Sequence, residues 1–259
     1  SALLVAACGD DGADRSVGPV TLVVYDSWPA DEPGSPLGIA LDEFTADTGI
    51  EVEILVSGDA GEMLAKASLT AGNPEGDVMW GVDSTFLSRA LDDEVFEPYV
   101  AAGADALPAE FTDLAPDGAA TPVDFGDVCV NYDIAALDAA GVKPPDSLAD
   151  LAEPEYASRL VVQNPATSSP GLAFLMASIA EFGGSGWQQY WAELRANGVL
   201  VVDSWNQAYY EAFTRAGGDR PLVVSYGSSP PFEVLFAEQP PASAPTAVAE
   251  STCFRQVEF

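Results

Sequence analysis

The sequence predicts an α/β fold, and three observations carry the prediction. Short β-branched runs alternate with segments whose apolar residues recur at helical spacing. The 259 residues are 48% hydrophobic, which suits one large or two medium domains with a buried core. No stretch beyond the N-terminus reaches the roughly 18 apolar residues of a membrane-spanning helix. We therefore expect parallel sheets flanked by helices.

The first part of the chain reads as repeated strand–helix–strand units. In chain order, we expect strands at residues 20–25, 51–56 and 77–80, alternating with helices at 37–47, 61–70 and 84–91. Each apolar run is short and bounded by glycine, proline or aspartate, as strands of a buried parallel sheet usually are.

The second part repeats the pattern after an extended segment at residues 122–132. We expect strands at 160–163, 200–202 and 222–225, and helices at 171–182, 187–197 and 205–215. Residues 239–249 are rich in proline and alanine and are expected to form a loop, and 253–259 a final strand. Because that strand stops only where the chain does, we expect further residues at the C-terminus, and likewise before Ser1.

The N-terminus resembles the end of a secretory signal. Leu3, Leu4 and Val5 lead through two alanines to Cys8, which is similar to a bacterial lipobox and predicts a lipid anchor on Cys8. The polar residues that follow read as a flexible tether. The alternative is an apolar strand with a chance cysteine. An exported, lipid-anchored protein at the cell surface or in the periplasm is expected.

The chain is strongly acidic, with a formal net charge of -32. Such a charge repels nucleic acid phosphates and anionic membranes, so we expect no nucleic-acid partner and membrane contact only through the lipid. A cationic ligand is favoured. The alternative is that the acidic surface only maintains solubility, for example in a salty habitat.

Cysteine and histidine usage narrows the chemistry further. An exported chain meets an oxidising compartment, so Cys129 and Cys253 are predicted to form a disulfide, with two buried free thiols as the alternative. The absence of histidine excludes histidine-based triads and typical zinc sites. Phosphate-loop and nucleophile-elbow motifs are also missing. We expect no enzymatic activity, no catalytic residue, no cofactor and no metal site.

Three loop-to-helix junctions in the second half are candidate ligand contacts. Free backbone N–H groups at a helix start favour an anion or a polar oxygen, and the neighbouring hydroxyls add donors. Plain helix capping is the alternative for each junction. The side chains concerned are Thr167, Ser168 and Ser169 before Pro170, Trp205 after Ser204, and Tyr226 with Ser228.

Two further candidates follow strands of the first half, where an α/β sheet places its ligands. The segment Tyr25, Asp26, Ser27, Trp28 comes directly after the first strand, and Asp83 follows the third. An aromatic ring beside a carboxylate suits a cationic heteroaromatic ligand through stacking, cation–π attraction and charge neutralisation. The alternatives are a partly buried loop tryptophan and a helix cap at Asp83.

Taken together, these segments resemble the thiamine-binding family of ABC-transporter substrate-binding proteins. The resemblance covers nearly the whole chain from Val20 and depends on the order of its motifs. They are Val24-Tyr-Asp-Ser-Trp28, Gly81-Val-Asp83, Asp124-Phe-Gly126, Asn164-Pro-Ala-Thr-Ser-Ser-Pro-Gly-Leu172, Trp205-Asn-Gln-Ala-Tyr209, Ser225-Tyr-Gly-Ser-Ser-Pro230 and Gln256-Val-Glu258.

The resemblance implies a two-lobed, type II periplasmic-binding-protein-like fold whose C-terminal part is missing from this chain. Residues 1–18 would be signal remnant, lipobox and tether, 19–123 plus 251–259 the first lobe, and 124–250 the second. Hinge strands are expected near 124–132 and 252–259, which would bring Cys129 close to Cys253.

The resemblance also implies a ligand site in the cleft between the lobes. Aromatic rings would surround the pyrimidine and thiazolium rings of thiamine, Asp83 would add charge, and Ser168 and Ser169 would hold its hydroxyethyl or phosphate end. The full set is Tyr25, Asp26, Ser27, Trp28, Asp83, Thr167, Ser168, Ser169, Trp205, Tyr209, Tyr226 and Ser228.

The function that this resemblance implies is capture of thiamine, thiamine monophosphate or thiamine diphosphate by a monomer that delivers it to an ABC transporter permease. A ferric-ion binder of the same fold usually needs adjacent tyrosines, and Tyr209 and Tyr210 are such a pair. Within a helix, however, neighbouring side chains point about 100° apart. Polyamine binding, an extracellular hydrolase and a surface interaction module without a small ligand also compete with thiamine capture.

Overall fold

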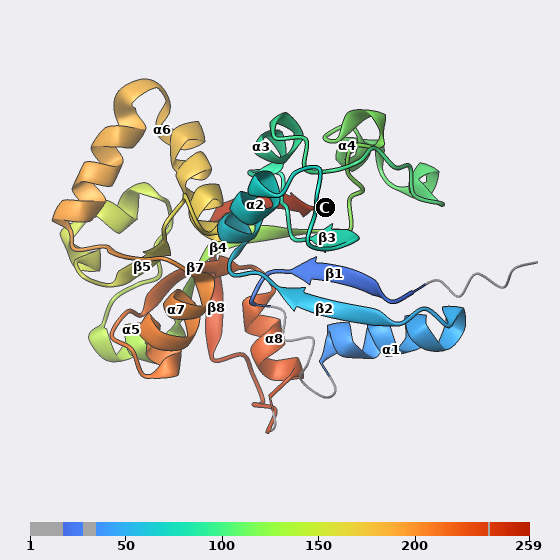
Figure 1. The fold of residues 1–259 in the computed structure, drawn as a ribbon. Helices are drawn as coiled ribbons and strands as arrows, with labels where there is room; N and C mark the ends of the chain where they lie inside the picture. The colour runs from blue at the N-terminus through green and yellow to red at the C-terminus, as the bar shows by residue number, and fades with distance from the viewer. Residues whose placement is uncertain (1–17, 28–34, 238) are drawn as a thin grey trace, which may run out of the picture.

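The computed structural model describes residues 18–27, 35–237 and 239–259. Cys8 with its expected lipid, and Trp28 of the expected ligand site, lie outside these residues. The described chain forms two sheets that lie side by side in Figure 1, each with its own helices. The α/β class predicted from the sequence is confirmed.

The first sheet is parallel throughout, as predicted. Its strand order is β2-β1-β3, with Val24 opposite Val56 on one side and Trp80 on the other. The strands are β1 (Val20–Val24), β2 (Val52–Val56) and β3 (Val78–Trp80), and the helices between and after them are α1 (Pro36–Thr48), α2 (Ala60–Leu69) and α3 (Leu87–Asp92).

Helix α3 begins later than the sequence predicts. The backbone N–H groups of Phe86 and Leu87 both donate to the Asp83 carbonyl, so a turn precedes the helix. Short elements then lead out of this half of the molecule: η1 (Ala104–Ala106), α4 (Ala109–Thr112) and η2 (Pro116–Gly118).

The second sheet is mixed, which the expectation of parallel sheets did not anticipate. Its order is β6-β5-β7-β4-β8, and β4 runs antiparallel to both of its neighbours, whereas β5, β6 and β7 are parallel to one another. The strands are β4 (Asp124–Asp133), β5 (Leu160–Gln163), β6 (Leu200–Val202), β7 (Leu222–Tyr226) and β8 (Thr246–Glu258).

Two helical predictions in this half change in detail. The helices expected at 171–182 and 187–197 are one element, α6, broken by non-helical backbone at Gly183 and Gly184. The helix expected at 205–215 is instead three short turns of different kinds. The elements are α5 (Ile134–Ala140), η3 (Ala149–Ala152), η4 (Pro154–Tyr156), α6 (Ser169–Ala196), α7 (Trp205–Gln207), the π-helix η5 (Ala208–Ala212), η6 (Thr214–Ala216) and α8 (Ser229–Leu235).

The loop expected over 239–249 is wrong for its last part, because strand β8 already begins at Thr246. Residues 246–249 pair with β4, which gives their backbone groups partners that local composition does not reveal. At its other end β8 reaches the first half: the N–H of Ser84 donates to the Val257 carbonyl, and that of Phe259 to the Val82 carbonyl. Strands β4 and β8 thus connect the two halves (Figure 1).

A disulfide joins Cys129 of β4 to Cys253 of β8, across 124 positions of sequence. It lies where the register between the two strands shifts, next to Val128 and Val130. Each half has its own buried core, one around Leu222 and Val224 and the other around Leu64 and Val82. Among the described residues, no helix has both the length and the apolar character required to cross a membrane.

Candidate functional site

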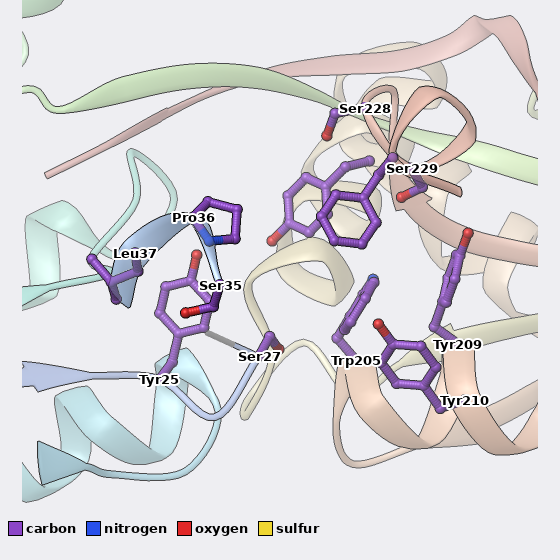
Figure 2. Close-up of a pocket in the computed structure, with 12 residues that line it drawn as sticks. Tyr25, Ser27, Ser35, Pro36, Leu37, Trp205, Tyr209, Tyr210, Ser228 and Ser229 are labelled. Carbon is purple, nitrogen blue, oxygen red and sulfur yellow. The ribbon is translucent and has the colours of Figure 1, made fainter. Parts of the chain in front are cut away.

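A pocket of about 220 Å³ opens between the two halves of the molecule. Figure 2 shows Tyr25, Ser35 and Pro36 on one side of it, and Trp205, Tyr209 and Tyr210 on the other. Among the described residues, no charged side chain lines it. The lining residues are Tyr25, Ser27, Ser35, Pro36, Leu37, Trp205, Tyr209, Tyr210, Tyr226, Ser228, Ser229 and Phe232.

Trp205 is held in place by a helix cap and by its own indole N–H. The Ser204 hydroxyl accepts the Gln207 N–H at 3.2 Å and so starts α7 with Trp205 in its first turn. The indole Nε1 donates to the Ser225 hydroxyl at the end of β7, over 2.9 Å. Its ring is stacked on that of Tyr209, which fixes one wall of the pocket.

Tyr25 follows β1 and forms part of the opposite wall. Its hydroxyl donates to Glu258 Oε2 at 3.2 Å, which ties the first half to strand β8. The ring lies against Gly81, where a Cβ atom would come within 2.2 Å of Tyr25 Cδ1. Gly81 also has a φ of 126°, a conformation that L side chains rarely adopt. Only a glycine at position 81 leaves room for the Tyr25 ring and adopts this backbone conformation without strain.

Carboxyl groups gather near Tyr25 and Tyr226, two of the four tyrosines that line the pocket. Burial, followed by the nearby Asp124 and Asp83, raises the pKa of Glu258 to about 8, although the Tyr25 hydrogen bond lowers it. The pKa of Tyr226 is likewise raised, first by burial and then by Glu258, Asp83, Asp59 and Asp124. The described lining of the pocket is therefore uncharged, and the carboxyl groups close to it favour a positive ligand over a negative one.

Asp59 is a site residue that the sequence analysis missed. It is buried, caps α2, and its Oδ2 accepts the backbone N–H of Trp205 at 3.0 Å. Burial raises its pKa despite the N–H donors of Trp205 and Ala60. The sequence did offer a signal for Asp59: like the other candidates, it is a polar residue that follows a strand (β2) and caps the helix after it (α2).

Asp83 and Ser169 meet, but below the pocket and not in its lining. Both are buried, and the Ser169 hydroxyl donates to Asp83 Oδ2. Gln256 Nε2 of β8 donates to the same hydroxyl at 2.6 Å, and Asp83 Oδ1 accepts the N–H of Thr85. The helix cap that was the alternative for Asp83 is wrong, because α3 begins only at Leu87, with Phe86 at its N-cap and no side-chain cap bond. Asp83 instead closes a local turn with Thr85 and contacts Ser169 of the other half. The arrangement leaves the Ser169 hydroxyl engaged with protein groups.

The structure divides the remaining expected residues between the pocket and its surroundings. Asp26 lies outside the lining, and its backbone N–H donates to the Gly58 carbonyl. Thr167 is also outside, with its hydroxyl donating to the Asp203 carbonyl at 2.6 Å. Ser168 is fully buried before α6, near enough to Asp59 to lower its pKa. Those that line the pocket are Tyr25, Ser27, Trp205, Tyr209, Tyr226 and Ser228.

Several lining residues had no sequence prediction. Phe232 and Ser229 belong to α8 and lie one turn apart, so both face the pocket. The motif at 225–230 predicted the start of this helix but did not include the Phe232 ring. Ser35 caps α1, whose first residues Pro36 and Leu37 face the pocket (Figure 2). A serine followed by proline, here Ser35 and Pro36, is a typical helix start and could have identified this segment from the sequence.

Tyr209 and Tyr210 do not form a ready pair of metal ligands. Their rings lie 82° apart, and the Tyr209 hydroxyl donates to Glu233. Burial and then Glu233 raise the pKa of Tyr209, which disfavours the phenolate that ferric iron requires. Among the described residues, no group of three or more cysteine or acidic side chains could hold a metal ion.

Comparison with known families agrees with this geometry. Residues 73–232, more than half of the chain, match the family described as bacterial extracellular solute-binding protein. The chain belongs to this family. The aromatic pocket lies between the two halves of this solute-binding protein.

Among solute-binding proteins, the chain is similar to proteins described as thiamine-binding. The thiamine-binding periplasmic protein of Brucella abortus is 28% identical over 235 residues, 90% of this chain and 66% of that protein. That of Salmonella typhimurium is 30% identical over 218 residues, 83% of this chain and 62% of its own length. The chain thus spans slightly less than two thirds of these relatives.

The structural comparison agrees. A solved periplasmic thiamin-binding protein matches with a TM-score of 0.76 and 28% identity, covering 92% of this chain and 70% of that one. Iron-bound HitA from Pseudomonas aeruginosa shares the fold, with a TM-score of 0.64 at 19% identity, 93% of this chain and 76% of that one. Both support the type II periplasmic-binding-protein-like fold that the sequence resemblance implies.

Proposed function

We propose that this solute-binding protein captures thiamine or its phosphates in the pocket between Tyr25 and Trp205. The observation that carries the proposal is a pocket whose described lining is aromatic and uncharged, with four carboxyl groups close to Tyr226. Thiamine joins a flat pyrimidine to a cationic thiazolium ring, and so needs both features. The names of the relatives from Brucella abortus and Salmonella typhimurium support the same ligand.

The aromatic walls account for ring recognition. Stacked or edge-on aromatic contacts contribute about 0.5–1.5 kcal/mol each, and a cation over a ring about 0.5–2 kcal/mol. Trp205, Tyr209 and Tyr226 lie within one cluster, with the Trp205 and Tyr226 ring centroids 6.4 Å apart. Hydroxyls such as Ser228 at the pocket edge suit the polar end of the ligand.

The carboxylates account for charge selection. A positive thiazolium lowers the electrostatic cost of ionising Glu258, whose pKa is raised by burial and by the nearby Asp124 and Asp83. The same potential opposes the phosphate charges of thiamine diphosphate. We therefore expect thiamine to bind at least as tightly as its monophosphate, and the diphosphate to bind least tightly.

The proposed role is binding and delivery, without a catalytic step. The partner would be the permease of an ABC importer, which receives the vitamin from the cleft. We further propose an exported protein, anchored through a lipid on Cys8 and acting as a monomer, with the two lobes as 19–123 plus 251–259 and 124–250. Strands β4 and β8, which connect the halves, would be the hinge.

Ferric-ion and polyamine binding are the competing functions. Solved iron and spermidine/putrescine binding proteins share this fold, the latter with a TM-score of 0.59 at 13% identity. The Tyr209 hydroxyl bond to Glu233 argues against iron. A polyamine would satisfy the carboxyl groups but would offer no flat ring to the face of Trp205 that is turned away from Tyr209.

A titration tests the proposal. Tryptophan fluorescence and calorimetry would follow the addition of thiamine, thiamine monophosphate, thiamine diphosphate, spermidine and ferric citrate to the purified protein. Saturable, stoichiometric binding of a thiamine compound, with none for spermidine or iron, is the expected result. Saturation by spermidine alone, or a visible charge-transfer band with iron alone, would replace thiamine with that ligand.

A further inference from the structure

Besides the contacts at the end of strand β8, the start of helix α2 brings the first half of the molecule into direct backbone contact with the second. The N–H of Gly61 donates to the Thr167 carbonyl at 2.8 Å, just before α6. Two residues earlier, Asp59 Oδ2 accepts the N–H of Trp205 at 3.0 Å. Neither Asp59 nor Gly61 lines the pocket. The contact therefore lies beside the pocket without contributing to its surface.

The contact requires that residue 61 have no side chain. A Cβ atom there would lie 2.7 Å from both the Ala166 and Thr167 carbonyl oxygens, and 2.8 Å from the Thr167 carbonyl carbon. These are backbone atoms of the loop before α6, and they cannot rotate aside as a flexible side chain could. Within α2 itself an alanine is the more favourable residue. The glycine thus serves the contact between the halves and not its own helix.

The same contact fixes one wall of the pocket. Asp59 caps α2 in the first half, and its second oxygen holds the backbone of Trp205 in the other. The Trp205 ring is then oriented by Ser225 and Tyr209, both of the second half. The position of Trp205 consequently depends on whether the two halves are together.

We propose that Asp59 and Gly61 are positioning residues that couple approach of the two halves to the placement of Trp205, so that ligand affinity is controlled from a contact the ligand does not touch. This inference rests on the proposed function for its ligand. Its prediction is that separating the halves at residue 61 weakens retention of the ligand, while leaving the aromatic pocket residues in place.

The decisive variant is Gly61→Ala, with Gly126→Ala as the matched control. Gly126 lies in β4, and a Cβ there meets no atom within 4 Å. Overpacking against rigid backbone should weaken thiamine binding by about tenfold or more. Because the penalty falls on the bound, closed arrangement, we expect faster dissociation with little change in association rate. Unchanged affinity and dissociation rate in Gly61→Ala would overturn the proposal.

A second pair of variants tests the link to Trp205. Asp59→Asn keeps a carbonyl oxygen that can accept the Trp205 N–H, whereas Asp59→Ala removes the acceptor. We expect Asp59→Ala to dissociate thiamine faster than Asp59→Asn, which should lie nearer the unsubstituted protein. Equal losses in the two variants would contradict a positioning role. Should alanine at 61 prevent folding, this pair carries the test alone.

A measurement without ligand separates this inference from the proposed function. Hydrogen exchange of the backbone N–H groups of Gly61 and Trp205 reports the two contacts directly. We expect faster exchange at both positions in Gly61→Ala and no change in Gly126→Ala. If the unsubstituted protein binds no thiamine, the proposed function fails. The positioning role fails independently if exchange is equal in all three proteins.

Discussion

The indole ring of Trp205 lies nearly parallel to the phenol ring of Tyr209, with centroids 4.9 Å apart and planes 15° apart. The stack gives the pocket a flat wall whose position is set from two directions, by the Ser225 hydroxyl and by Asp59. Because the Tyr209 ring backs the indole on one side, the other aromatic contacts of Trp205 are made edge-on or at an angle.

Substitution of Trp205 should abolish most ligand binding. Trp205→Leu removes both stacking and cation–π contributions, so we expect thiamine affinity to fall by at least about tenfold. Trp205→Phe keeps a ring but loses the Nε1 bond to Ser225, and should lie between. Calorimetry measures the affinities. Trp187→Phe, in α6 and outside the pocket lining, is the control and should bind normally.

Glu258 makes folding stability depend on pH. Its folded-state pKa of about 8 lies above the ordinary value of 4.5, so between these values the folded state holds a proton that the unfolded chain has lost. Stability that is present below pH 4.5 is therefore lost as the pH rises towards 8. We expect Glu258→Gln to raise the free energy of unfolding at pH 9, by more than about 1 kcal/mol, and to change it little at pH 4.

Urea unfolding at both pH values measures this difference. Asp105→Asn is a useful control, because Asp105 lies in the short turn η1. A Glu258→Gln effect that is equal at pH 4 and pH 9 would show that the substitution acts through packing instead of charge.

The same group should make binding of a cation depend on pH. A positive ligand near Glu258 favours its ionised form, so the bound protein should release a proton when the pH lies below about 8. Thiamine affinity should then rise as the pH increases towards 8 and level off above it. Calorimetry in buffers of different ionisation enthalpy counts the protons released. Glu258→Gln should release none.

The disulfide should contribute substantially to stability. Its closed loop spans 124 positions, and removal of a native disulfide typically costs about 2–5 kcal/mol. We expect a Cys129→Ala, Cys253→Ala double variant to unfold at correspondingly lower denaturant concentration. Reductant supplies the matched control: it should weaken the unsubstituted protein to the level of the double variant and leave the double variant unchanged.

Loss of the Ser169 hydroxyl should destabilise the protein. Ser169→Ala removes the hydroxyl that donates to Asp83 Oδ2 and accepts from Gln256 Nε2, and leaving these buried atoms unpaired costs about 1–3 kcal/mol. Ser185→Ala changes an exposed serine of the same helix and should be nearly neutral. Thermal unfolding compares the two. If both variants melt together, the buried network contributes no net stability.

Local sequence was sufficient for most strands but not for their pairing. The runs that became β1, β2 and β5 are β-branched and bounded by turn residues, so their positions could be predicted. Nothing in the run that became β4 encodes that both of its neighbours are antiparallel to it. Strand β8 shows the limit clearly, because its first residues resemble a proline-rich loop until β4 supplies their partners.

The sequence predicted those pocket residues that have a suitable side chain and also lie at a recognisable strand end or helix start. Trp205 and Tyr226 sit at junctions that the sequence marks by serine caps and strand ends. Asp59 also lies between a strand and a helix, but its role in the site depends on its hydrogen bond with the N–H of Trp205, 146 positions away. The local sequence does not reveal that bond. Asp83 was recognised as a charged group at a strand end, whereas its burial beneath the pocket is a property of long-range packing with Ser169.

The β4 and β8 ribbon also limits how the two halves can move. Its strands are paired from Asp124 opposite Glu258 to Asp133 opposite Thr246, and a covalent cross-link fastens them part-way along. Because the two strands are hydrogen-bonded and joined by a disulfide, they resist sliding past each other and bend or twist together. Any change in the relative orientation of the halves would therefore deform both strands at once, and the stiffness of the cross-linked pair would oppose it.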